Sequence, residues 1–334
     1  MPEPTPPHDH ASGHDEHGHD HDHDHGHGDL LTLEDRHGHE AEIYDAMAEQ
    51  LLAEMSDEEF LVQADRIPFH NREHVDYLTF AIDQLRPLAG KRILEVGAGG
   101  GMLAVYLALQ GADVTGIDVS AGILEVAAKR AEISGVADRT RFVHVPIEEF
   151  DDPSGSFDAV IGNNVVHHFE RDLAMDNLAR LMAPGARATF CEPVLFVPEA
   201  VRTVRYSDPV AKRFPPHTHT PDERSLNQTD IAIIERYFGE VSWRPFQVLC
   251  RLQNFRELSD PTWNRLESID RWMLRRIPPT RWLTRMIVLT LDDPRPSAKA
   301  RAVAAPDPVP TTSAPPTADP ATPHLATHSE RTSS

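Results

Sequence analysis

A glycine-rich segment, followed at a distance by an acid, carries the strongest chemical signal in the sequence. Residues 95–101 read EVGAGGG, and Asp118 lies seventeen residues beyond them. Glycines have no Cβ atom, so the backbone can turn sharply and approach a ligand closely. A helix that starts after such a turn offers unpaired N–H groups to the ligand, and an acid at the end of the next strand can accept from both hydroxyls of a ribose. The pattern therefore predicts a site for a nucleotide-like ligand.

A second group of polar side chains follows a later apolar run. Residues 163–169 read NNVVHHF, which places two adjacent imidazoles after a pair of amides. Histidine titrates near neutral pH, so it can remove a proton from a hydroxyl nucleophile. His168 or His167 is therefore the candidate general base. The alternative for each is a structural histidine that caps the next helix.

Two further residues are candidates for contact with a substrate. Glu192 follows another apolar run directly and is either a substrate ligand or a solvated acid at the end of a strand. His70, in the sequence FHNREH at 69–74, is a candidate for a lid over the site or belongs to a helix surface.

Alternating strands and helices must bring these groups together. Apolar runs bounded by turn residues predict strands at 92–97, 113–117, 141–145, 157–162, 186–191, 241–249 and 286–291, and the intervening patterns predict helices at 101–110, 121–133 and 172–182. Residues 40–84 predict two or three helices that would cap the sheet. The order indicates an α/β, doubly wound, mostly parallel sheet, in which ligands collect at the carboxyl ends of the strands.

With these elements in order, residues 90–192 resemble the class I S-adenosylmethionine-dependent methyltransferases, particularly the bacterial small-molecule branch related to ubiquinone and menaquinone biosynthesis. The EVGAGGG segment is similar to the family's first motif, and Asp118 to its ribose-binding acid. Residues 156–160 (SFDAV) are similar to its fourth strand, and residues 181–185 (LMAPG) to the turn before its fifth. The resemblance implies a seven-stranded, Rossmann-like sheet with S-adenosyl-L-methionine as cofactor.

The resemblance also implies which residues hold the cofactor. Glu95 and the glycine loop would hold its methionine portion, and Asp118 its ribose. The implied contacts are Glu95, Gly97, Ala98, Gly99, Gly101, Asp118, Val119, Ile147 and Asn163.

One position departs from the family pattern. The family commonly has an Asp after its third strand, whose side chain accepts from the adenine amino group, and Pro146 stands at that place here. The backbone of Ile147, or the side chain of Glu148 after a shift in loop register, would have to replace that contact.

Composition changes at both ends of the chain. Residues 1–40 hold eleven of the 20 histidines and are strongly acidic, and residues 294–334 are rich in Pro, Ala and Thr. Neither segment can bury enough apolar surface to offset chain entropy, so we expect both to be disordered tails. Residues 41–293 remain as a methyltransferase domain with an N-terminal helical cap and insertions at about 193–229 and 250–285.

The composition also limits metals and partners. Imidazoles in the His-rich tail can chelate divalent zinc, nickel or copper, but no catalytic metal is expected, because the crevice lacks an HxxxH or carboxylate cluster. The net charge of -21 disfavours nucleic acid as a partner. Two cysteines exclude a disulfide framework and agree with a cytoplasmic protein, and no apolar run is long enough to span a membrane.

The segment 262–285 is basic and amphipathic and contains tryptophans. Its predicted apolar face comprises Trp263, Leu266, Ile269, Met273 and Ile277. This face could rest on an anionic membrane as a peripheral contact. The alternative is a helix packed over the edge of the sheet with a solvated outer face.

The sequence predicts an enzyme that transfers a methyl group from S-adenosylmethionine to a small-molecule or lipid-linked acceptor, at oxygen because of the two imidazoles. A carbon acceptor, as in methylation of a quinone ring, is the alternative, because it needs the same base and positioning. One alternative is a noncatalytic cofactor- or metal-binding protein on a degenerate methyltransferase domain, which Pro146 and the His-rich tail favour. Another is a nucleotide-dependent oxidoreductase, but Met102 occupies the place of the third glycine of the dinucleotide motif.

Overall fold

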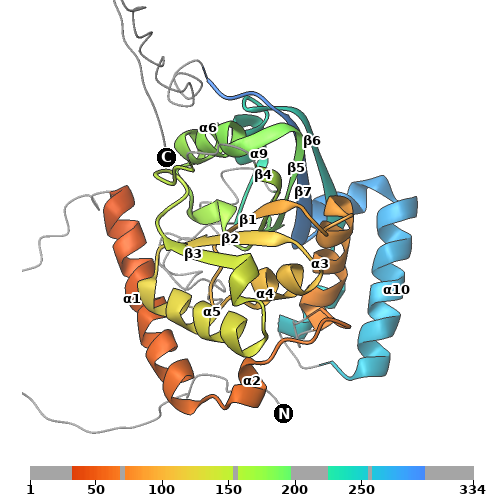
Figure 1. Ribbon diagram of the computed structural model, residues 1–334. Helices are drawn as coiled ribbons and strands as arrows, with labels where there is room; N and C mark the ends of the chain where they lie inside the picture. The colour runs from red at the N-terminus through yellow and green to blue at the C-terminus, as the bar shows by residue number, and fades with distance from the viewer. Residues whose placement is uncertain (1–31, 68–71, 153–156, 197–224, 255–257, 298–334) are drawn as a thin grey trace, which may run out of the picture.

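A computed structural model describes residues 32–67, 72–152, 157–196, 225–254 and 258–297. Its centre is a seven-stranded sheet in the order β3-β2-β1-β4-β5-β7-β6 (Figure 1). The strands are β1 (Arg92–Val96), β2 (Asp113–Asp118), β3 (Thr140–His144), β4 (Phe157–Asn163), β5 (Met182–Pro193), β6 (Phe238–Phe246) and β7 (Met286–Pro294). Only β7 runs antiparallel to its neighbours within this sheet, so the predicted mostly parallel, doubly wound fold is confirmed.

Helices cover both faces of the sheet, which is why its central strands are apolar throughout. One face packs against α3 (Arg72–Leu85), α4 (Met102–Leu109) and α5 (Ala121–Ile133), and the other against α6 (Arg171–Leu181) and α9 (Gln228–Ile234) (Figure 1). Short 3-10 turns lie at η1 (Ala137–Arg139), η2 (Val166–His168), η3 (Cys250–Asn254) and η4 (Pro278–Leu283). The two large apolar clusters on these faces form the core.

The carboxyl ends of β1, β2 and β4 meet at one edge of the sheet. Val96 at the end of β1 pairs with Ile117 of β2 and with Gly162 of β4. The glycine loop follows β1, and Asp118 and Asn163 are the last residues of β2 and β4. The predicted gathering of polar groups at this edge is therefore observed.

Helix α1 (Leu33–Glu54) corrects the predicted boundary of the N-terminal tail. Thr32 caps it, since Asp35 N–H donates to Thr32 Oγ1 (3.1 Å) and Thr32 N–H donates to Asp35 Oδ2 (3.0 Å). This reciprocal capping box starts the helix inside the segment assigned to the tail. Residues 33–40 are therefore helical, while residues 1–31 and 298–334 lie outside the described residues.

Helix α1 then lies along α5, and α2 (Asp57–Phe60) follows it (Figure 1). The side chain of Asp45 fixes the contact, because its Oδ1 accepts from Ser120 Oγ at 2.5 Å and from Gly122 N–H at 2.9 Å. The α1 helix is thus tied to the loop that follows β2.

The side chains that helix α10 (Asp260–Arg276) buries differ from the apolar face that the sequence predicts. Trp263 is buried, but Ile269 and Ile277 are exposed, and the polar Asp270 is buried instead. Asp270 is needed inside because it accepts backbone hydrogen bonds from residues 248–250. Within the described ranges, no helix combines the length and apolar character needed to cross a membrane.

Candidate active site

The loop between β1 and α4 is shaped by glycines with different tasks. Gly97 (φ 70°) and Gly101 (φ 76°) lie against neighbours so closely that a Cβ would come within 2.7 Å of Val165 and 2.6 Å of Ala127, respectively. Gly99 also has positive φ (48°), but a Cβ there would meet nothing within 4 Å. The first two glycines are required by packing, and the third leaves open space above the backbone.

Asp118 is joined to this loop through the backbone. Its Oδ2 accepts from Gly99 N–H at 2.9 Å and its Oδ1 from Ser120 N–H at 3.0 Å. Burial raises the pKa of the Asp118 carboxyl, and these backbone hydrogen bonds oppose that shift. A carboxylate oxygen can accept more than one hydrogen bond, so both oxygens can also accept from a ligand.

Two buried acceptors beside the loop have no hydrogen-bond partner among the residues that the structure describes. Glu95 is 4% exposed, and its Oε2 has none, as is also true of Asn163 Oδ1. Burial raises the pKa of Glu95 well above its ordinary value, and the nearby Asp118 raises it further. Buried acceptors are nearly always paired in native structures, so this pair suits a ligand that brings hydrogen-bond donors.

We expect Glu95→Gln to stabilise the ligand-free protein by about 1 kcal/mol at pH values above the raised pKa of Glu95, because the substitution then removes a buried charge whose Oε2 has no hydrogen-bond partner among the described residues. The raised pKa means that the ionised carboxylate destabilises the folded state above that pKa. The difference between the two proteins should therefore shrink as pH falls and Glu95 takes up a proton. Urea unfolding over a pH series measures this, with the exposed Glu125→Gln on α5 as control. A variant less stable than wild type at every pH would contradict the expectation.

A cleft lies at this edge of the sheet, and it includes five of the predicted site residues: Gly97, Asp118, Val119, Ile147 and His168. Its other lining residues are His37, Glu40, Val96, Ile117, Val145, Pro146, Glu148, Val165 and Phe169. The remaining predicted contacts, Glu95, Ala98, Gly99, Gly101 and Asn163, belong to the adjoining loop and strand ends but do not line the cleft.

Three acidic or basic residues of the cleft were not among the predicted contacts. His37 and Glu40 come from α1. The composition of residues 1–40 led us to assign this part of the chain to the tail, although the capping box at Thr32 indicates a helix. Glu148, considered only as a substitute after Pro146, lines the cleft beside it. Its Oε1 accepts from Glu170 N–H at 2.8 Å, and burial raises its pKa.

The two adjacent histidines have different environments. His168 lines the cleft, with Nδ1 3.4 Å from Glu40 Oε2. His167 is 5% exposed, and its Nδ1 lies 2.7 Å from Glu192 Oε2. The geometry therefore favours His168 over His167 as the group that can meet an acceptor.

The position of Glu192 differs from both sequence interpretations, a substrate ligand and a solvated acid at the end of a strand. It is fully buried, so it is not a solvated acid, and it does not line the cleft. Its Oε1 accepts from the backbone N–H groups of Val165 and Val166, both at 2.9 Å, and its Oε2 contacts His167. The carboxylate holds the β4–α6 loop, which corrects the expected contact with substrate.

Two other predictions concern residues that cannot be placed. His70 and the His-rich tail lie outside the described residues. In the ranges that the structure describes, no three His, Cys, Asp or Glu side chains form a group that could hold a metal ion.

The sheet, the glycine loop and the acid at the end of β2 indicate the class of this domain. Residues 93–185 match a family model described as "Methyltransferase domain". The resemblance to class I S-adenosylmethionine-dependent methyltransferases is thereby confirmed for this part of the chain.

Two of the relatives that this chain resembles carry names from quinone biosynthesis. The chain is 41% identical over 100 residues to "Ubiquinone biosynthesis O-methyltransferase" of Psychrobacter cryohalolentis, covering 29% of this chain and 39% of that protein. It is 39% identical over 107 residues to "Demethylmenaquinone methyltransferase" of Clavibacter sepedonicus, covering 32% and 42%. The matched stretch thus spans about two fifths of the length of these relatives.

Among solved structures, phosphoethanolamine N-methyltransferase 2 of Haemonchus contortus aligns with a TM-score of 0.48 and 16% identity. The alignment covers 80% of this chain and 61% of that chain.

Proposed function

We propose that this protein binds S-adenosylmethionine in the cleft and transfers its methyl group to an oxygen of a small-molecule or lipid-linked acceptor. The observation that carries the proposal is the glycine loop joined to Asp118 inside a matched methyltransferase domain. The name of the Psychrobacter relative, an O-methyltransferase of ubiquinone biosynthesis, supports an oxygen acceptor on a small molecule. The same family match favours methyl transfer over nucleotide-dependent oxidation.

The residues present fit such a cofactor. The open space above Gly99 would admit it, and the orphaned Glu95 Oε2 and Asn163 Oδ1 would accept from its ammonium group. Asp118 would accept from the ribose hydroxyls. Glu148 and the backbone of Ile147 would face the adenine, in place of the acid that Pro146 replaces.

The cofactor supplies, when bound, a methyl group on a positively charged sulfur. The contribution of the protein is orientation and proton removal. Glu40 lies against Nδ1 of His168, so in the tautomer with its proton on Nδ1 the ring carries its lone pair on Nε2. Nε2 would accept the proton of the acceptor hydroxyl, which makes that oxygen a better nucleophile.

Titration calorimetry with S-adenosylmethionine and S-adenosylhomocysteine tests the binding step. Transfer of a labelled methyl group from the cofactor into a cell extract tests the chemistry. Binding of both compounds and a labelled small-molecule product are expected. A folded protein that gives heat with neither compound would contradict the proposal.

We expect His168→Gln to lower kcat by roughly 100-fold or more, because removing a general base typically costs that much. Affinity for S-adenosylmethionine should stay within about twofold, since His168 acts on the acceptor. Steady-state kinetics and calorimetry on the same preparations separate the two effects. The exposed His39→Gln on α1 is the matched control. Equal loss of turnover and cofactor affinity in His168→Gln would overturn its role as base.

We also propose that the outer face of α10 and η4 contacts an anionic membrane. Trp272 (57% exposed), Trp282 (42%) and Leu283 (58%) present large apolar side chains to solvent. Arg281 lies 5.9 Å from the ring centroid of Trp282, so a cation accompanies the exposed aromatics. Aromatic rings and arginines together suit the interface of an acidic bilayer. Cosedimentation with vesicles that contain phosphatidylglycerol tests this contact: Trp282→Ser should bind them less than wild type, and equal binding would contradict the contact.

A further inference from the structure

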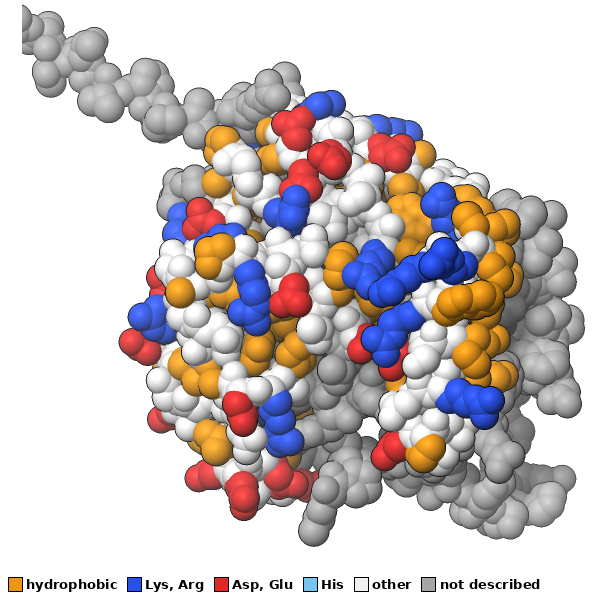
Figure 2. Space-filling view, turned by 90° about the vertical axis from the view of Figure 1, so that its right-hand side faces the viewer, with side chains coloured by type: hydrophobic (Ala, Val, Ile, Leu, Met, Phe, Trp, Pro, Cys, Tyr) orange, Lys and Arg blue, Asp and Glu red, His pale blue; other side chains and the backbone are white. Residues whose placement is uncertain are grey.

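A hollow beside α3 has a composition that the proposed methyl transfer does not use. It lies between α3, the end of β6 and α10, and has a volume of about 440 Å³. It shares no lining residue with the cleft. Figure 2 shows the face that carries α10, where arginine side chains gather beside hydrophobic ones.

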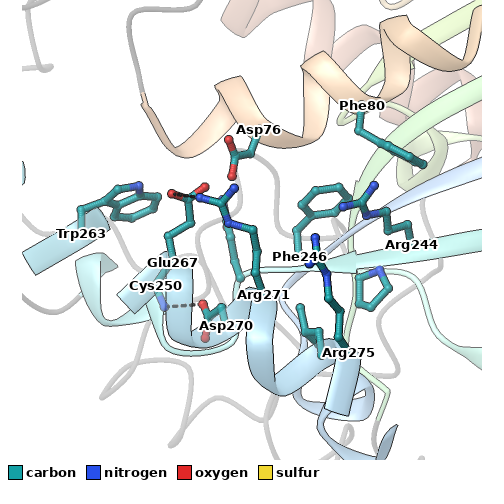
Figure 3. A pocket seen from close by; sticks show the side chains of 13 residues that line it. Asp76, Phe80, Arg244, Phe246, Cys250, Trp263, Glu267, Asp270, Arg271 and Arg275 are labelled. Carbon is teal, nitrogen blue, oxygen red and sulfur yellow. Dashed lines mark hydrogen bonds and ion pairs between the residues drawn. The ribbon is translucent and has the colours of Figure 1, made fainter. Parts of the chain in front are cut away.

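Three guanidinium groups converge on this hollow from two elements. Arg244 comes from β6, and Arg271 and Arg275 from successive turns of α10 (Figure 3). Glu267 pairs with Arg271 at 2.8 Å. Neither Arg244 nor Arg275 forms an ion pair with a carboxylate among the residues that the structure describes. This end of the hollow therefore carries positive charge in a protein whose net charge is -21.

The guanidinium groups are close enough to affect one another. Burial lowers the pKa of Arg244, and the charges of Arg275 and Arg271 lower it further, while Asp76 across the hollow opposes them. An anion bound between these cations would relieve that repulsion.

Aromatic rings form the wall beside the positive end. The guanidinium carbon of Arg244 lies 4.3 Å from the ring centroid of Phe80 and 5.3 Å from that of Phe246 (Figure 3). The two rings are 5.9 Å apart and tilted by 53°. Their apolar surface suits a flat or apolar body attached to the anionic group.

The floor of the hollow is held in place by Asp270. Its Oδ2 accepts from the backbone N–H groups of Val248 (2.9 Å) and Cys250 (3.0 Å), and its Oδ1 from that of Leu249 (2.7 Å). This ties the turn after β6 to α10 and fixes Arg271 and Arg275 relative to the strand that carries Arg244. The charges are consequently preorganised and no chain rearrangement is needed to bring them together.

We propose that this hollow binds an amphipathic anion, with a phosphate or carboxylate group between Arg244 and Arg275 and an apolar or aromatic body against Phe80 and Phe246. Arginine can donate two parallel N–H groups to two oxygens of either a carboxylate or a phosphate. The anion can come from a soluble compound or from the headgroup of an anionic lipid.

Phenyl phosphate and inorganic phosphate are suitable probes, titrated into the full chain by calorimetry. We expect phenyl phosphate to bind more tightly than inorganic phosphate, and Arg275→Gln to weaken its binding roughly tenfold or more. Arg244→Gln should behave alike. The control is Arg276→Gln, which makes the same change of charge on the same helix but does not line the hollow. Absence of phenyl phosphate binding, or equal binding by the Arg275→Gln and Arg276→Gln proteins, would overturn the proposal.

Vesicles distinguish the two sources of the anion. Cosedimentation with phosphatidylcholine vesicles, with and without phosphatidylglycerol, is measured for wild type, Arg275→Gln and Trp282→Ser. Loss of phosphatidylglycerol-dependent binding in both variants assigns the hollow to a lipid headgroup. Unchanged vesicle binding in Arg275→Gln, together with its lost affinity for phenyl phosphate, assigns it to a soluble anion. Neither the titrations with phosphates nor the vesicle experiment requires S-adenosylmethionine. Both would therefore still test the hollow if the proposed methyl transfer failed.

Discussion

Asp118→Ala is expected to weaken binding of S-adenosylmethionine by about 1–3 kcal/mol, or roughly 5- to 150-fold. The side chain is the carboxylate that would accept from the ribose, and it also holds Gly99 N–H at 2.9 Å. The substitution would therefore remove both a ligand contact and a support of the glycine loop. Titration calorimetry measures the change, after thermal unfolding has shown that the variant is folded.

The control for Asp118→Ala lies on the same strand. Asp113 begins β2 at the opposite edge of the sheet, where it pairs with Arg139 at the surface. Asp113→Ala should leave cofactor affinity unchanged. A 2′-deoxy analogue of S-adenosylhomocysteine should lose affinity for the wild type but little for Asp118→Ala, as expected when the two changes remove the same interaction. Equal affinity of the Asp118→Ala and Asp113→Ala proteins would refute the ribose contact.

Glu192→Ala is expected to lower the free energy of unfolding by about 3–5 kcal/mol, since it removes a buried carboxylate that accepts two backbone hydrogen bonds and contacts His167 Nδ1 at 2.7 Å. The change would leave two backbone N–H groups of the β4–α6 loop and the buried His167 without their acceptor. Cofactor affinity should fall as well, because Val165 in that loop packs against Gly97. Urea denaturation and calorimetry check the two effects.

A graded pair of variants separates the role of Glu192 from the general cost of mutation. Glu192→Gln retains one oxygen for the backbone donors and should lose less stability than Glu192→Ala. Glu125→Ala, at an exposed position of α5, should change stability by no more than about 0.5 kcal/mol. If Glu192→Ala unfolds at the same urea concentration as Glu125→Ala, the carboxylate does not hold the loop.

The central strands could be predicted from the sequence because each is a short apolar run between turn residues. Predicted and observed bounds of β1 and β2 differ by one residue at their ends. The prediction was less accurate for β6, which spans Phe238–Phe246 in place of 241–249, and for β5, which spans Met182–Pro193 in place of 186–191. Several side chains of β6 are exposed, so its apolar pattern is weaker and its ends are poorly marked.

The site was predicted only in part, because residue type does not determine the direction of a side chain. His167 and His168 are adjacent, and the sequence made each of them a candidate base. In the structure His167 contacts the buried Glu192, whereas His168 lines the cleft. That division depends on the 3-10 turn at Val166–His168, which has no distinctive sequence signal. The lining residues from α1 were missed because average composition outweighed one local capping box at Thr32.

The position of α1 also affects how the molecule can be shortened for experiments. A version trimmed at residue 41 on compositional grounds would keep every strand of the sheet and yet lack His37 and Glu40, two of the side chains that wall the cleft. It would also expose a helix start without its cap. A version that begins at Thr32 retains the cap and both wall residues, and is the shorter form in which assays on the cleft remain meaningful.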